Sequence, residues 1–350
     1  MPSRFLPILI LSLTGLLVFG GWFVLQERTE VLAPEPEELK GVSLPNEEQE
    51  SEARELVFVE DSKNDEVIVL TKEGEIVKRI KVDHGPHDIA LSPDGKFVVT
   101  ANFYSNTISV ISVQSLSLQK TITTGDGAHG VVFSPDGSFL FIANARENTL
   151  SIIETATFTK QTKVNVGDYP EYIGVTKDGS KIFTTNLGDE GSITVLKNDG
   201  FESKVIKEMA SGIDPHGWAL SPDGNSIVIT NLGSNFIYLL DAETFEEINH
   251  IDTGAATEFA VFKNDTELWV TNIGAHYISI IDVGQNKIIG QITVGETPHG
   301  ISFSTDKTLA FVPLYKPGEL VIIDVEKRKV VKKIKVGEEL HNSVVVKRRP

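Results

Sequence analysis

A unit of about 42 residues recurs seven times along this chain of 350 residues. One copy reads HGVVFSPDGSFLFIANARENTLSIIETATFTKQTKVNVG from His129. One position of the unit is histidine in five copies and glutamate in two, and successive copies are 42, 42, 45, 42, 41 and 42 residues apart. We call these seven positions the marker residues: His87, His129, Glu171, His216, Glu258, His299 and His341. Internal repetition at this period is typical of solenoids, propellers and arrays.

Each complete copy is built from four short segments rich in β-branched and aromatic residues. Three copies spell Ser-Pro-Asp-Gly after the first segment, a turn in which proline presets φ and glycine accepts a positive φ. Four strands per copy, with no helical periodicity between them, predict an all-β, seven-bladed β-propeller. In five copies the second strand ends in an asparagine: Asn102, Asn144, Asn186, Asn231 and Asn272.

The two ends of the repeat region predict how the ring closes. The first copy begins at Glu55 and has only three strands, which we place at residues 56–60, 66–70 and 79–82. The last copy ends with an extra strand at residues 342–347. We therefore expect the C-terminal strand to complete blade one, which leaves no free sheet edge between the ends.

The N-terminal residues predict export. Residues 5–25 contain no charge, which is long enough to span a bilayer, and Arg4 before them favours a cytoplasmic N-terminus. The alternative is a cleaved secretory signal, which would release a secreted protein. Either alternative places the repeats outside the cytoplasm, in the periplasm or extracellular space. Residues 26–54, with nine glutamates and a net charge of −6, predict a disordered acidic linker, so the domains are 1–25, 26–54, the propeller at 55–347, and a tail at 348–350.

Composition excludes several functions. The chain has no cysteine, which removes thiolate metal sites, iron–sulfur clusters, covalent c-type haem and cysteine nucleophiles. Its net charge is −17, and the only basic cluster that we find along the sequence is the tail at residues 347–349, so nucleic acid is not an expected partner.

The strand pattern, the Ser-Pro-Asp-Gly turns and the Pro-His-Gly entrances at Pro215 and Pro298 resemble the YVTN-family β-propeller repeat, over about residues 55–347. In the alignment, Pro313 replaces the strand-end asparagine in the last copy and Glu60 replaces it in the first. The resemblance implies the fold but no single activity, because such propellers include binding scaffolds, lactonases, dehydrogenase subunits and haem or copper domains.

The marker residues are the candidate functional site. In an antiparallel blade they fall on one face, at the mouth of the central channel, together with the strand-end asparagines, Tyr104 and Tyr315. Imidazole and carboxylate hold copper, zinc or iron without thiolates, so the seven marker residues are candidate metal ligands. The asparagines and the two tyrosines are candidate ligand contacts. Two plainer interpretations stay open: the histidines are inherited repeat consensus, and the asparagines cap turns.

We find no catalytic motif in the sequence. Residues 125–130 satisfy G-x-G-x-x-G, but a strand follows where a dinucleotide site requires a helix. The sequence thus favours a monomeric, membrane-anchored binding or scaffold module that contacts an envelope protein or small ligand, with a metal or cofactor at the marker residues. The alternatives are an enzyme, either a lactonase-like hydrolase or a copper- or haem-type redox propeller, and a cell-surface structural or adhesion protein.

Overall fold

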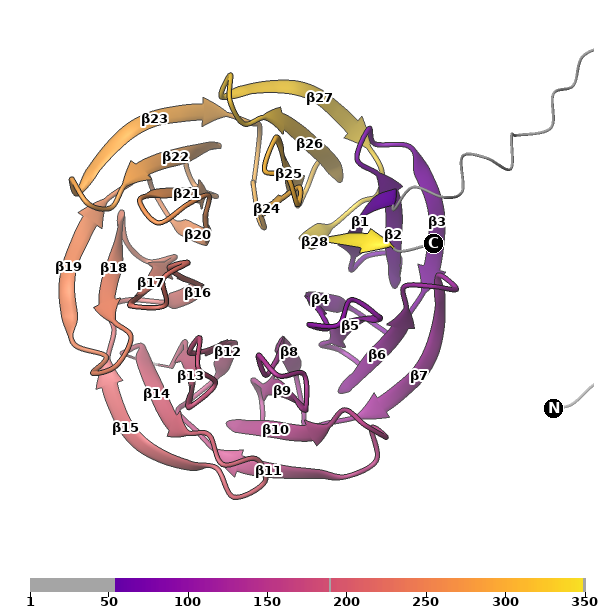
Figure 1. Ribbon diagram of the computed structural model, residues 1–350, viewed down its shortest axis with the longest axis vertical. Coiled ribbons are helices and arrows are strands. Elements are labelled where there is room, and N and C mark those ends of the chain that lie inside the picture. Colours follow the sequence, from indigo (N-terminus) through magenta and orange to yellow (C-terminus); the bar gives the residue numbers. More distant parts are fainter. Residues whose placement is uncertain (1–53, 189, 349–350) are drawn as a thin grey trace, which may run out of the picture. The chain divides into compact units, whose positions relative to one another are not determined.

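The computed structural model describes residues 54–188 and 190–348, and in this part of the chain every regular element is a strand. The strands form seven antiparallel four-stranded sheets arranged as blades around a central axis (Figure 1). The all-β, seven-bladed propeller expected from the repeat is confirmed. In blades two to seven the four strands follow one another in sequence from the axis outward.

Each blade is described from its innermost strand to its outermost. Blade one contains β28 (Leu340–Arg348), β1 (Arg54–Asp61), β2 (Glu66–Thr71) and β3 (Ile76–Lys81). Blades two to four contain β4 (Pro86–Leu91), β5 (Phe97–Asn102), β6 (Thr107–Ser112) and β7 (Ser117–Thr123); β8 (Ala128–Phe133), β9 (Phe139–Asn144), β10 (Thr149–Glu154) and β11 (Gln161–Asn165); and β12 (Pro170–Val175), β13 (Lys181–Asn186), β14 (Ser192–Lys197) and β15 (Lys204–Ala210). Blades five to seven contain β16 (Pro215–Leu220), β17 (Ser226–Asn231), β18 (Phe236–Asp241) and β19 (Glu247–Asp252); β20 (Thr257–Phe262), β21 (Glu267–Asn272), β22 (Tyr277–Asp282) and β23 (Lys287–Thr293); and β24 (Ser302–Phe303), β25 (Leu309–Leu314), β26 (Glu319–Asp324) and β27 (Lys329–Lys335).

Blade one joins the two ends of the described chain. β28 pairs antiparallel with β1, in a register that places Val345 opposite Val57 and Val346 opposite Leu56. The predicted closure by the C-terminal strand is confirmed (Figure 1). The strand continues to Arg348, one residue beyond its expected end, and β3 begins at Ile76 rather than at residue 79.

The core lies between the blades rather than within a single sheet. Between blades one and two, for example, Phe58 and Val69 are fully buried in one cluster with Val98 and Ile111. Alternate residues of the inner strands face opposite sides of each sheet, so every blade contributes to two such layers. Burying one such side chain stabilises the fold by about 1.5–3 kcal/mol.

The turn between the first two strands of a blade behaves as its residues predict. In blade three, Asp136 Oδ1 accepts hydrogen bonds from Ser134 Oγ at 2.6 Å and from the Ser138 amide at 3.0 Å. Gly137 has φ 72°, a conformation that glycine adopts without strain. The aspartates of these turns are therefore structural.

The predicted anchor at residues 1–25 lies outside the described residues, as does the predicted linker apart from Arg54. In the part of the chain that the structure describes, no helix is long and apolar enough to cross a membrane.

Candidate functional site

The marker residues lie where the innermost strands lose their register with the second strands. In β4, β8 and β12 the pairing is interrupted between Pro86 and Asp88, Ala128 and Val131, and Pro170 and Tyr172. β16 and β20 show the same interruption, and the β1–β28 pairing breaks opposite His341. A β-bulge adds an unpaired residue and changes the direction of its side chain. The marker residues are these unpaired residues.

Sequence reasoning missed these bulges, although a sign of them was present. Proline precedes the marker residue in four copies, at positions 86, 170, 215 and 298. Because proline lacks an N–H to donate, it occurs within sheets at edges, strand starts or bulges. Proline at the entrance of an innermost strand therefore indicates irregular pairing at this position.

The bulges bring all seven marker side chains together around the axis. Six of them are at most 7% exposed, and His87 is half-buried. The marker residues thus form one cluster, as the repeat predicts, but they close the channel as a buried layer rather than lining an open mouth. We call this cluster the marker ring.

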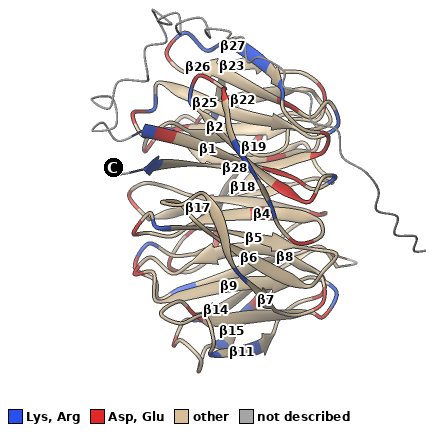
Figure 2. Cartoon of the chain, turned by 90° about the vertical axis from the view of Figure 1, so that its right-hand side faces the viewer, with Lys and Arg blue, Asp and Glu red and all other residues tan. Residues whose placement is uncertain are grey.

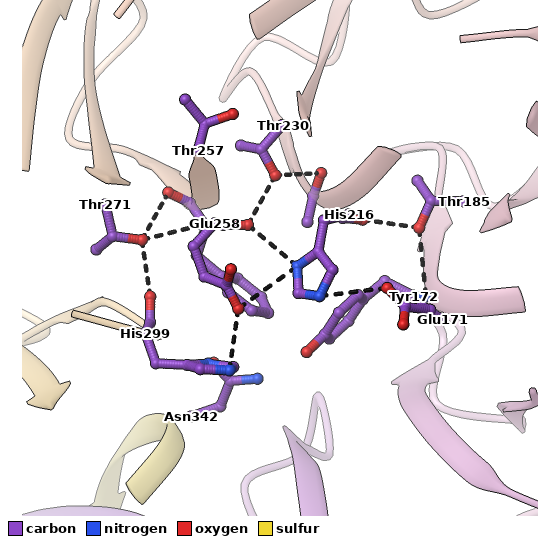
Figure 3. Close-up of polar contacts among 12 residues, drawn as sticks. Glu171, Tyr172, Thr185, His216, Thr230, Thr257, Glu258, Thr271, His299 and Asn342 are labelled. Carbon is purple, nitrogen blue, oxygen red and sulfur yellow. Dashed lines mark hydrogen bonds and ion pairs between the residues drawn. The ribbon is translucent and has the colours of Figure 1, made fainter. Parts of the chain in front are cut away.

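One side of the marker ring is a row of alternating histidines and carboxylates, part of which Figure 3 shows. Glu258 Oε1 lies 2.9 Å from His299 Nε2 and 3.6 Å from His216 Nδ1. His216 Nε2 lies 3.2 Å from Glu171 Oε2, and Glu171 Oε1 lies 3.7 Å from His129 Nε2. Each carboxylate is therefore flanked by two imidazoles.

The charges of this side follow from burial and pairing. Burial opposes ionisation of Glu258, but the positive charges of His216 and His299 outweigh it and lower the pKa of Glu258 to about 2. Burial also opposes protonation of His216, yet the carboxylates of Glu258 and Glu171 raise its pKa above the ordinary value. For Glu171, burial is the larger effect and raises the pKa. The Glu258–His216 pair is therefore ionised near neutral pH.

The other side of the marker ring consists of neutral imidazoles. The ring centroid of His87 lies 4.0 Å from that of His129 and 4.1 Å from that of His341. Burial, and then the charges of His299 and His216, lower the pKa of His87 to about 3. Burial and the neighbouring histidines also lower the pKa values of His129 and His341 well below the ordinary value.

Two of these imidazoles carry nitrogen atoms without a hydrogen-bond partner. The Nδ1 atoms of His87 and His341 are buried and unpartnered within the described residues. His129 Nδ1 lies 3.1 Å from the carbonyl oxygen of Glu171, which can only accept, so in the neutral ring Nδ1 carries the proton and Nε2 carries the lone pair. Buried polar atoms usually have partners, so these nitrogens are unusual.

Carboxylates that sequence reasoning missed lie directly beside the marker ring. Asp88 follows His87, and its carboxylate accepts hydrogen bonds from the Val131 amide and from Asn342 Nδ2, both at 2.9 Å. Burial raises the pKa of Asp88 to about 7 and raises that of the fully buried Glu60 well above its ordinary range. The positions of Asp88 and Glu60 beside the marker ring follow from the register of their strands, and the repeat motif does not indicate them.

The strand-end asparagines are fully buried inside the blades. Asn144 Nδ2 donates to Thr149 Oγ1 and Ser151 Oγ, both at 2.9 Å, and its Oδ1 accepts from the Gly125 amide at 2.9 Å. Asn102, Asn186 and Asn272 make similar bonds to the third strand. These four side chains therefore hydrogen-bond within their own blade, as the plainer interpretation expects, and their assignment as ligand contacts stays a prediction.

The fifth asparagine and two substituted positions differ from this pattern. Asn231 is equally buried, but its side chain has no hydrogen-bond partner among the described residues, because blade five has Phe236 and Tyr238 in place of the hydroxyl-bearing residues. The pairing also corrects the alignment in the outer copies. Asp61, not Glu60, pairs with the residue before the marker in blade one, and Leu314, not Pro313, does so in blade seven.

The two tyrosines lie differently with respect to the marker ring. Tyr315 is half-buried, with its ring centroid 4.9 Å from that of His341. Tyr104 is 59% exposed, and its ring lies 5.2 Å from that of His84 rather than against a marker residue. Of the two, only Tyr315 covers the marker ring.

Within residues 54–188 and 190–348, no group of three or more histidine, aspartate or glutamate side chains is arranged to hold a metal ion. The unpartnered nitrogens of the marker ring thus do not converge on one point. The assignment of the seven marker residues as metal ligands stays a prediction.

Comparisons with known proteins agree with the fold. The family model of the YNCE-like beta-propeller matches residues 48–185, and that of the cytochrome D1 heme domain matches residues 224–346. No curated protein matches the chain in sequence.

Similar solved structures include other propellers. A functionally unknown protein from Desulfotomaculum acetoxidans is 15% identical, with TM-score 0.76, over 84% of this chain and 99% of that one. Hydrazine synthase from Kuenenia stuttgartiensis is 17% identical, with TM-score 0.68, over 76% and 91%. Dihydro-heme d1 dehydrogenase NirN, in complex with DHE, is 15% identical, with TM-score 0.63, over 83% and 74%. At these identities the likeness concerns the fold alone. The chain is a seven-bladed β-propeller whose residues 48–185 match the YNCE-like family.

Proposed function

We propose that this propeller is a binding module that holds a transition-metal ion at the neutral side of its marker ring. The observation that carries the proposal is the contact among three neutral imidazoles, those of His87, His129 and His341, two of which have buried, unpartnered nitrogens. Only a deprotonated imidazole nitrogen binds a metal, so the low pKa values favour ligation rather than oppose it.

The surroundings of these imidazoles suit a cation. The Glu171 carbonyl fixes the His129 tautomer, as a backbone carbonyl commonly does for a metal-ligating histidine. The carboxylates of Glu171 and Glu258 supply negative charge within the same ring. Because the nitrogens do not converge on one point, binding requires the imidazoles to turn about their side-chain bonds. Copper, zinc and iron are ions that imidazole holds without thiolate, and the first two serve as the test ions.

The proposal is tested by metal analysis of residues 48–350, which contain all seven blades. The protein is made without an affinity tag, incubated with copper or zinc and freed of unbound ions. We expect close to one ion per chain, lost in His87→Ala and retained in His250→Ala, since His250 lies on outer strand β19 with a 61% exposed side chain. A thermal melt confirms that both variants fold. Equal loading of the two variants, or no loading of either, refutes the site.

A haem-related propeller is a second candidate, favoured by the cytochrome D1 heme domain match over residues that include Glu258, His299 and His341. The marker ring itself does not fit a macrocycle. Its histidine rings are in mutual contact, with centroids 4.0–4.7 Å apart, and six of its members are at most 7% exposed. The ring therefore leaves no room for a macrocycle between its side chains, and its histidines are not assigned as haem ligands.

The proposed setting is an exported, monomeric and membrane-anchored propeller, on the basis of the apolar residues 5–25 and the acidic residues that follow them. Within that setting the module holds its ion for an envelope partner or a small ligand. Hydrolysis of a lactone by the loaded protein would instead favour the enzyme alternative, through a metal-bound water. Binding to whole cells by a metal-free protein would favour adhesion.

A further inference from the structure

The outermost strands of blades one and seven carry a concentration of positive charge. β3 contributes Lys78, Arg79 and Lys81, β27 contributes four lysines, and neither strand has a carboxylate. We call these seven side chains the basic rim: Lys78, Arg79, Lys81, Lys329, Lys332, Lys333 and Lys335. All seven are exposed, and Figure 2 shows this positive charge on β27.

Ring closure brings the two strands together although they are separated by most of the chain. β27 and β3 follow one another around the circumference (Figure 1). Lys332 Nζ donates to the Glu73 carbonyl oxygen at 2.7 Å, and Arg79 Nη2 donates to the Val336 carbonyl oxygen at 2.7 Å. The expectation that the tail is the only basic cluster is therefore corrected, because the basic rim forms only in the folded ring.

Most of this charge is not neutralised by neighbouring side chains. Arg79 and Lys81 both pair with Glu66. The five lysines of the basic rim other than Lys81 make no ion pair within the described residues. On outer strand β19, by contrast, there are two carboxylates and no lysine or arginine. In a chain of net charge −17, this local excess needs an explanation.

Apolar side chains are exposed among these charges. Ile76 is 44% exposed and Val77 45% exposed on β3, and Val331 is 55% exposed on β27. Both strands are outer edges of their sheets, where lysine usually serves to prevent pairing with another chain. That role explains single lysines, but it does not explain seven basic residues on two adjoining blades.

We propose that the basic rim docks the propeller on an anionic phospholipid surface. Lysine and arginine are attracted to lipid phosphates, and the exposed isoleucine and valines suit the headgroup boundary. Basic and apolar side chains together favour a lipid surface over nucleic acid, because the phosphate backbone of a nucleic acid gives the apolar side chains no apolar surface to contact. The described chain also begins at Arg54 in blade one, 29 residues after the apolar segment ends at Leu25, so a membrane held by that segment lies within reach of this blade.

The experiment measures sedimentation of residues 48–350 with vesicles of phosphatidylcholine containing one third phosphatidylglycerol, against pure phosphatidylcholine. These residues contain all seven blades and both strands of the closure, so the apolar segment cannot itself cause binding. We expect binding to the anionic vesicles only, weakened by salt. Changing the four β27 lysines to glutamine (K329Q, K332Q, K333Q, K335Q) should lower the partition coefficient by about 600-fold, since each lysine contributes about fivefold.

The control variant changes four lysines on the outer faces of other blades: K120Q, K163Q, K204Q and K207Q. It keeps the same net charge as the β27 variant, so equal losses in the two would overturn the proposal. Binding to heparin but not to vesicles would also overturn it, as would concentration-dependent self-association that buries β27. A second variant, Val77→Ser with Val331→Ser, tests the apolar part and should weaken vesicle binding without changing the melting temperature by more than a few degrees. Metal loading at the marker ring does not enter this assay, so the two proposals fail or stand separately.

Discussion

Replacing Glu258 with glutamine removes a negative charge from the marker ring while keeping the shape of the side chain. Glu258 is 2% exposed, and Oε1 lies 2.9 Å from His299 Nε2 and 3.6 Å from His216 Nδ1. The variant leaves these imidazoles without the carboxylate that faces them. Breaking a buried pair from one side typically destabilises a protein by about 3–5 kcal/mol.

The pKa of Glu258 gives an independent magnitude. It falls from the ordinary 4.5 to about 2, and at about 1.36 kcal/mol per pH unit this stabilises the folded state by about 3 kcal/mol. For a propeller of this size the corresponding fall in melting temperature is about 5 °C. Both approaches agree on a loss of about 3 kcal/mol in the free energy of unfolding.

The pH range of the effect follows from the signs of the two shifts. Because the folded-state pKa of Glu258 is lowered, its contribution is present above about pH 4.5 and is lost as the pH falls toward 2. Because the folded-state pKa of His216 is raised, its contribution is present below about pH 6.5 and is lost as the pH rises through that raised value. The difference between wild type and variant is therefore largest between about pH 4.5 and 6.5.

Urea unfolding of residues 48–350 at about pH 5.5, with repeats near pH 3 and pH 8, measures this difference. Glu326→Gln is the control, since Glu326 is exposed in the turn between β26 and β27 and should change stability by less than about 0.5 kcal/mol. A difference below about 1 kcal/mol at pH 5.5 for Glu258→Gln would refute the ion-pair account, as would a difference that does not shrink at low pH.

Two further predictions concern the blades. Asn144→Ala removes three hydrogen bonds and should lower the free energy of unfolding by about 3 kcal/mol, as measured by urea unfolding. Asn231→Ala removes no side-chain hydrogen bond and should lower the free energy of unfolding by less than half as much. Equal losses in the two variants would show that these hydrogen bonds do not stabilise the blade. Ending the chain at Gly337 removes β28, leaves β1 an open edge and should abolish the cooperative thermal transition, while ending it at Arg348 should leave the transition unchanged. Circular dichroism measures the thermal transitions of the two shortened chains, and a cooperative transition of the chain that ends at Gly337 would contradict closure by β28.

The sequence is sufficient to predict the fold because every copy repeats the same local evidence. The Ser-Pro-Asp-Gly turns and alternating strands define one blade, and seven copies define the number of blades. Closure was predictable for a different reason: the missing innermost strand at one end matched the extra strand at the other. Neither inference requires knowledge of side-chain contacts.

The local geometry of the site was harder to predict from the sequence than the fold. The marker residues could be grouped from spacing, but their burial depends on the bulges that turn them toward the axis. The burial of Asn144 depends on Thr149 and Ser151, whose hydroxyls pair with it only once the second and third strands are in register. The basic rim was beyond reach, because β3 and β27 are distant in sequence and adjoin only when the ring closes.

The order of residues around the marker ring explains how so many ionisable groups can be buried together. Each carboxylate has a histidine on both sides, so no two carboxylates are neighbours, and the negative charge of Glu258 faces the imidazoles of His216 and His299. The remaining neighbours, His341, His87 and His129, follow one another without a carboxylate between them, and burial keeps them neutral. A ring of seven identical histidines would lack this boundary, since every imidazole would have the same neighbours. The two glutamates, which depart from the repeat, thus separate a half that contains both carboxylates from a half of neutral imidazoles, and the unpartnered nitrogens of that neutral half are the basis of the proposed ion site.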